Sequence, residues 1–109
     1  MAISFEQARQ IVSDLMLPEW EADGEGGLFV VSADGAENDD HWQILFGDRR
    51  WLIDGDAAFR PIPGVTGFIS KDDGSWLDVP PFVVAVSNPT LLRFYESFTH
   101  VSGGAAEHR

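Results

Sequence analysis

His41-Trp42-Gln43-Ile44-Leu45-Phe46 is the stretch on which the predicted fold depends, because large apolar residues occupy every second position. This period of two places Trp42, Ile44 and Phe46 on one face of a β-strand. Three further apolar runs follow, at residues 51–53, 65–70 and 75–79. The last two flank Lys71-Asp72-Asp73-Gly74, and an Asp-Gly turn between alternating runs is typical of an antiparallel hairpin. Gly74 is expected at positive φ, a conformation that glycine adopts without strain.

An amphipathic helix is predicted near the N-terminus. Ser4 and Gln7 have the spacing of a capping box, in which each side chain bonds the backbone N–H of the other residue. One apolar stripe then recurs at helical spacing, formed by Phe5, Ala8, Ile11, Val12, Leu15 and Met16. Pro18 is expected to end the helix at about Leu17, because the residue before a proline is disfavoured in the α conformation. The sheet is the one surface against which this stripe can pack.

The remaining segments complete an α+β fold. Residues 28–33 are apolar except for Ser32, residues 82–86 are apolar throughout, and both segments are predicted as further strands. Asn88 followed by Pro89 is typical of a helix start, and residues 91–98 continue at helical spacing, although their aromatic content also fits a strand. We therefore predict an N-terminal helix packed on an antiparallel sheet of about five strands, with a short C-terminal helix. The predicted core comprises Phe5, Ile11, Leu15, Val30, Trp42, Ile44, Phe46, Phe68, Trp76 and Val84.

Composition and length limit what the chain can do. Its 109 residues suit a single domain, predicted over residues 1–101 with a flexible tail at 102–109. The absence of cysteine excludes disulfides, thiolate nucleophiles and cysteine-ligated zinc. The net charge of −11 argues against nucleic acid as a partner, because phosphates need Lys and Arg. No run is long enough to span a bilayer and no signal-peptide pattern is present, so a cytoplasmic protein without membrane contact is expected.

The acidic residues are unevenly distributed. Ten carboxylates and no Lys or Arg fall between Arg9 and Arg49. This bias has two interpretations: a solvated surface that keeps the protein soluble, or a patch of one sign that faces a basic protein. Under the second interpretation, Glu37, Asp39 and Asp40 steer the approach of the partner, and an aromatic residue supplies a buried anchor. The predicted partner-binding residues are Trp20, Glu37, Asp39, Asp40 and Trp42.

No catalytic constellation is evident in the sequence. His41, His100 and His108 belong to no spaced metal motif, and Asp39-Asp40-His41 is a weak candidate for binding a cation. Asp54 and Asp56 flank a glycine, a pattern that is more typical of a turn than of paired catalytic carboxylates. No serine has the context of a nucleophile elbow, and no glycine-rich phosphate loop opens a helix. Neither catalytic residues nor a metal or other cofactor are therefore predicted.

The order of several motifs resembles a known family. Ile3-Ser4-Phe5-Glu6-Gln7-Ala8-Arg9 opens the helix, Trp42 and Trp51-Leu52-Ile53-Asp54 follow, and Phe68-Ile69-Ser70-Lys71-Asp72-Asp73-Gly74 forms a hairpin. Over residues 3–80 this order resembles the small bacterial immunity proteins of the Imm35 family and the related YrhB-type domain. Ser70 and Asp73 stand where the family hairpin has aspartate and threonine, and residues 55–64 look like an insertion. The resemblance implies a non-enzymatic cytoplasmic protein that binds and neutralises a cognate toxin.

Two functions of different class follow from these observations. The favoured one is a non-enzymatic acidic binding protein, most concretely an immunity protein whose partner is a basic toxin domain. The alternative is a small-molecule binding protein or enzyme that uses a cavity between helix and sheet. Trp42, Trp51 and Trp76 are the candidate lining of that cavity, although three tryptophans in a small sheet also fit a simple core role.

Overall fold

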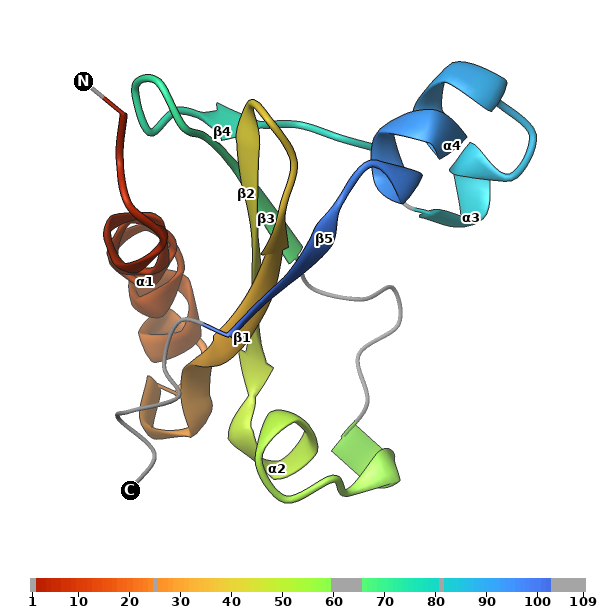
Figure 1. Ribbon diagram of the computed structural model, residues 1–109. Coiled ribbons are helices and arrows are strands. Elements are labelled where there is room, and N and C mark those ends of the chain that lie inside the picture. Colours follow the sequence, from red (N-terminus) through yellow and green to blue (C-terminus); the bar gives the residue numbers. More distant parts are fainter. Residues whose placement is uncertain (1, 25, 60–65, 81, 103–109) are drawn as a thin grey trace.

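One antiparallel sheet separates two helical layers, with α1 on one face and α4 on the other (Figure 1). The computed structural model describes residues 2–24, 26–59, 66–80 and 82–102. This architecture confirms the predicted α+β fold, with an N-terminal helix, a five-stranded antiparallel sheet and a short C-terminal helix. The elements follow in the order α1 (Phe5–Ala22), η1 (Gly26–Leu28), β1 (Phe29–Glu37), β2 (His41–Asp48), α2 (Arg49–Leu52), η2 (Ala57–Phe59), β3 (Thr66–Ser70), β4 (Trp76–Leu77), α3 (Phe82–Ala85), α4 (Pro89–Glu96) and β5 (Thr99–Ser102).

The sheet has the strand order β4-β3-β2-β1-β5. Strands β1 to β4 form a meander, in which each strand pairs with the next one along the chain. Strand β5 instead returns from the end of the described chain and pairs with the second half of β1, from Asp34↔Ser102 to Glu37↔Thr99. The tail predicted at residues 102–109 therefore begins within β5, and residues 103–109 lie outside the described residues.

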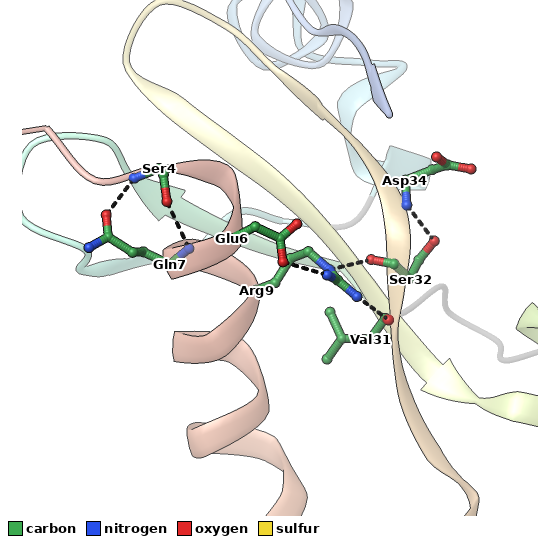
Figure 2. A network of polar contacts seen from close by, with 7 residues as sticks. All are labelled: Ser4, Glu6, Gln7, Arg9, Val31, Ser32 and Asp34. Carbon is green, nitrogen blue, oxygen red and sulfur yellow. Dashed lines mark hydrogen bonds and ion pairs between the residues drawn. The ribbon is translucent and has the colours of Figure 1, made fainter. Parts of the chain in front are cut away.

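Helix α1 begins as its sequence predicts and supplies one side of the core. The Gln7 amide donates to Ser4 Oγ at 3.1 Å, and the Ser4 amide donates to Gln7 Oε1 at 2.7 Å (Figure 2). Phe5, Ala8 and Val12 are buried on its inner face. They pack against the buried side chains of Ile44, Phe46 and Ile69, and several half-buried residues surround this cluster, among them Ile11, Trp42 and Trp76.

The second half of α1 differs from the prediction. The helix does not end before Pro18 but continues to Ala22. Trp20 holds this last part, because its ring packs edge-on against Phe29 with ring centroids 5.5 Å apart. The predicted core position of Leu15 is also wrong, since 51% of this residue is exposed. The buried line runs through positions 5, 8 and 12 and continues at Met16, so Leu15 is rotated away from the sheet.

A side chain of α1 donates hydrogen bonds to the backbone at a β-bulge in β1. Three residues of β1 stand opposite the single residue Leu45 of β2, between the pairs Val31↔Phe46 and Gly35↔Ile44. The guanidinium of Arg9 donates to the carbonyl oxygens of Ser32 at 2.8 Å and Val31 at 3.1 Å, and it pairs with Glu6 (Figure 2). These bonds satisfy backbone acceptors that the interrupted ladder leaves without a strand partner. Arg9 therefore has a structural role.

Aromatic rings cover part of the opposite face of the sheet. Phe68 of β3 lies within 5.3–5.7 Å, between ring centroids, of Phe94, Tyr95 and Phe98. His41 of β2 packs edge-on against Phe94 at 5.7 Å. Asn88 caps α4 by accepting hydrogen bonds from the amides of residues 90 and 91, as its position before a proline predicts. The C-terminal helix is thus confirmed, and it is the element that packs on this face.

One predicted strand, residues 82–86, and the short apolar run at residues 51–53 form helical turns instead. Residues 82–86 fall largely in α3, since the sheet position beside β1 is taken by β5, and Val84 is 48% exposed rather than part of the core. Residues 51–52 belong to α2, whose N-cap Asp48 accepts a hydrogen bond from the Arg50 amide at 2.8 Å.

Val30 of the predicted core is half-buried. Gly74 has φ of 76°, which confirms the prediction for its turn. No helix among the described residues is both long and apolar enough to cross a membrane.

Candidate functional site

The turn between β1 and β2 presents two exposed aspartates on a fixed backbone. Asn38 Oδ1 accepts hydrogen bonds from the amides of Asp40 at 3.0 Å and His41 at 2.7 Å, and the Asn38 amide donates to the His41 carbonyl. The Asn38 side chain also donates to Ser97 Oγ just after α4, at 3.1 Å. The turn is therefore held by Asn38, and the carboxylates of Asp39 and Asp40 are exposed to solvent.

The turn between β3 and β4 lies at the same end of the sheet (Figure 1). The Lys71 amide donates to the Asp40 carbonyl at 2.9 Å, which joins the two turns directly. Asp72 and Asp73 are both exposed there. The Ser75 amide donates to Asp73 Oδ1 and holds the pKa of that carboxyl below its ordinary value. We name these four exposed residues, Asp39, Asp40, Asp72 and Asp73, the acidic turn end.

Lys71, the cation in these two turns, already contacts other residues of the protein. Lys71 Nζ lies 2.6 Å from a carboxylate oxygen of Glu37 and 4.3 Å from the centroid of the Trp42 ring. Trp42 in turn donates from Nε1 to the Ile3 carbonyl at 3.1 Å and packs on Phe5. Glu37 and Trp42, both predicted to bind a partner, therefore make contacts within the protein. Glu37 balances the Lys71 charge, and among the described residues no cation pairs with the four aspartates.

Trp20, the fifth predicted site residue, lies far from the acidic turn end. Its ring contacts Phe29 at the start of β1, whereas Glu37 is the last residue of that strand. At ~3.3 Å per residue these two ends of β1 are roughly 25 Å apart. The structure thus brings Glu37, Asp39, Asp40 and Trp42 together and leaves Trp20 at the other end of the sheet.

The long acidic interval of the sequence is not one patch in space. Glu19, Glu21 and Asp23 are exposed in and just after the last turn of α1, near Trp20. Asp48 pairs with Arg50 at the opposite end of β2 from Asp40, and the hydrogen bonds from the Arg50 side chain hold the pKa of Asp48 below its ordinary value. Separation along the strands therefore divides the interval into several smaller groups.

Among the described residues, no three His, Cys, Asp or Glu side chains are arranged so that they could hold a metal ion. The ring of His41 turns toward Phe94 on the face of α4, and its Nδ1 is buried with no hydrogen-bond partner in the described part of the chain. Asp39 and Asp40 are instead exposed in the turn. The local sequence Asp39-Asp40-His41 thus does not place its three side chains in one environment.

Asp72 and Asp73 are the members of the acidic turn end that the sequence interpretation missed. It treated their turn as purely structural, because Gly74 identified the hairpin. A signal was nevertheless present: in a meander of antiparallel strands, the first and third turns fall at the same end of the sheet. The pairing of β2 with β3 then brings Asp72 and Asp73 beside Asp39 and Asp40.

Comparison with known proteins identified no relative of this chain. The chain matches no protein-family model, no curated protein and no solved structure. The resemblance to the immunity proteins therefore stays a prediction, carried by the motifs within residues 3–80.

Proposed function

We propose that this protein is a non-enzymatic binding protein whose acidic turn end contacts a basic protein partner. In its most concrete form it is a cytoplasmic immunity protein that neutralises a cognate toxin by direct binding. The observation that carries the proposal is the convergence of four exposed aspartates from two turns, joined by the bond from the Lys71 amide to Asp40. The motif resemblance supports the immunity role.

Electrostatics supports a protein partner at this place. Four like charges at one end of a protein of net charge −11 attract a basic surface and accelerate encounter with it. The turns are held by Asn38 and by Gly74 at positive φ, so little conformational freedom is lost when a partner binds. Among the described residues, Asp39, Asp40 and Asp72 form no ion pair that would stabilise the fold. Their carboxylates are therefore available to a partner.

The alternative, a ligand cavity lined by tryptophans, has less support. Trp42 and Trp76 pack against the core cluster, while Trp51 lies in α2 beyond the far end of β2. A hollow of about 420 Å³ does lie between α1 and β1, and Arg9 lines it. The Arg9 guanidinium is already bonded to Glu6 and to two backbone carbonyls, so it has little capacity left for a ligand.

The test is charge reversal at the acidic turn end. The triple variant Asp39→Lys, Asp40→Lys, Asp72→Lys is compared with the parent for its rate of association with the basic protein that the parent captures from its source cells. We expect association to be about tenfold slower or more at low salt, with a smaller difference at high salt, because screening weakens steering. Glu37 and Asp73 are left unchanged because they bond Lys71 and Ser75.

The matched control reverses three exposed carboxylates at the other end of the molecule, by Glu19→Lys, Glu21→Lys and Asp23→Lys. It changes the net charge equally and flanks Trp20, so it also tests the predicted role of that residue. Slower association in the control alone would move the binding surface to the end of α1. Failure to capture any basic protein, or equal rates in all three proteins, would contradict the proposal.

A further inference from the structure

We infer that an open groove between α4 and the segment after β4 receives an apolar side chain of a partner segment that also carries Lys or Arg. The groove has a volume of about 390 Å³. This inference rests on the proposed function and adds to it an anchoring site and the chemistry of the segment that occupies it. The acidic turn end attracts the partner, and the groove holds it.

The groove is apolar on both walls. Leu77, Val79 and Pro80 form one wall, and Leu91 and Phe94 of α4 form the other. Leu77 is 38% exposed, and the remaining apolar residues are half-buried apart from the exposed Pro80. The volume lies near the lower end of the range of about 300–1,000 Å³ that is typical of ligand pockets. An apolar side chain that enters the groove would remove this surface from water, which is the favourable term in most association.

The walls are fixed relative to one another before anything binds. The Tyr95 hydroxyl of α4 donates to the Pro80 carbonyl at 2.5 Å and so ties the two walls together. The Asn88 side chain caps the start of α4 through the amides of Thr90 and Leu91. Tyr95 and Phe94 are also packed on Phe68 of the sheet. A groove that is formed in advance binds with a lower entropic cost than one that must be ordered on binding.

Charge decides between the possible occupants. Asp78 is the one charged residue among those that line the groove, and Arg93 of α4 is not among them. Asp72 and Asp73 lie in the turn that leads directly into β4, so the acidic turn end adjoins the wall that contains Leu77. An apolar centre with an acidic border is complementary to an apolar residue with basic neighbours, and apolar centres with polar rims are the usual anatomy of protein interfaces.

The probe is a random dodecapeptide library displayed on phage and selected against the full chain. We expect the enriched peptides to combine a large apolar residue with adjacent Lys or Arg. A synthetic copy of the most enriched peptide should bind Thr90→Lys about tenfold more weakly than the parent, because Thr90 is an exposed lining residue and a lysine there repels basic side chains. The control Glu19→Gln makes the same change in net charge on α1 and should bind like the parent.

Three results would overturn the inference: no enrichment, enriched peptides without basic residues, or equal binding to Thr90→Lys and the parent. Self-association of the parent that Thr90→Lys abolishes, measured by sedimentation, would assign the groove to a second copy and also overturn it. The natural partner separates this inference from the proposed function. Association that slows on reversal of the turn aspartates but not in Thr90→Lys would retain the proposed function and reject the groove. Association that slows in Thr90→Lys but not on reversal of the turn aspartates would retain the groove and reject the acidic turn end as the partner surface.

Discussion

The two faces of the sheet differ in how completely they are covered. On the α1 face, Val12, Ile44 and Ile69 are fully buried and interlock as one cluster. On the α4 face, the aromatic group around Phe68 covers one region, and an open groove remains beside it. The α1 face is thus packed like a protein interior, whereas the α4 face keeps apolar surface within reach of solvent.

This difference separates stability from binding. A close-packed face contributes most of the burial energy of the fold and tolerates little change. A face that keeps a preformed apolar groove next to exposed charge has the composition of an interaction surface. The acidic turn end lies where the two turns meet, and α4 reaches it through the bond from Asn38 to Ser97. We therefore expect changes on the α1 face to act on stability and changes on the α4 face to act on binding.

The largest effect is expected from Ile44→Ala. Ile44 is fully buried on the α1 face, so truncation should lower the free energy of unfolding by about 2–5 kcal/mol, measured by denaturant titration. The matched control is Leu45→Ala, because Leu45 is the next residue of β2, faces the other side and is half-buried. We expect a loss of about 1 kcal/mol there. Equal losses in the two variants would mean that the faces do not differ as described.

A smaller effect is expected from Gly74→Val in the turn next to α1. The positive φ of 76° strains a residue with a β-branched side chain, and the new Cβ would lie 2.8 Å from Cδ1 of Ile11. The expected loss is about 1–2 kcal/mol, measured by thermal melting. Gly24→Val is the control, because Gly24 has φ of 81° but no described residue places an atom within 4 Å of an added Cβ. The difference between the two variants reports the contact with α1. A Gly74→Val variant that melted like the parent would contradict the assigned turn.

The smallest effect concerns the hydroxyl of Tyr95 on the α4 face. Burial raises the pKa of Tyr95 above its ordinary value of 10.0, so folding favours the neutral phenol. This contribution to stability is fully present below pH 10 and is lost as the pH rises through the raised pKa of the folded state. Tyr95→Phe should remove that alkaline pH dependence. It should also lower the free energy of unfolding by about 0.5–1.5 kcal/mol, because the hydrogen bond to Pro80 is lost. An identical alkaline limb in both proteins would show that Tyr95 is not its cause.

Several local features of the fold were predictable because neighbouring residues determine them. The capping box of Ser4 and Gln7, the alternation of residues 41–46, the glycine turn at Gly74 and the start of α4 at Asn88 each depend on contacts within a few residues. The extension of α1 past Pro18 was not predictable in this way, since Trp20 is held by Phe29 from another element. The same limit applies to β5, whose strand partner β1 is far away in the sequence.

The candidate site was predictable only in part. Asp39 and Asp40 stand in a polar turn between two apolar runs, and their exposure follows from that position. The interval without Lys or Arg led to the prediction that Glu37 steers a basic partner, but Lys71 of the next hairpin pairs with Glu37. Trp42 has the pattern of a binding anchor as well as that of a core residue, and its bond to Ile3 and contact with Phe5 are tertiary contacts.

By itself, the sequence determined the α1 stripe, the hairpin turns, the start of α4 and the strongly acidic composition. These features depend on backbone conformation and residue type at short range. The tertiary structure alone decided which strands form the edges, which side chain of the α1 stripe is left exposed, and which carboxylates pair with a cation among the described residues. Pairing and burial depend on residues that are distant in the chain, and a carboxylate is compensated by whatever charge the fold brings within a few ångströms. Lys71 beside Glu37, and Asp72 and Asp73 beside the turn of Asp39 and Asp40, are the cases that define this surface.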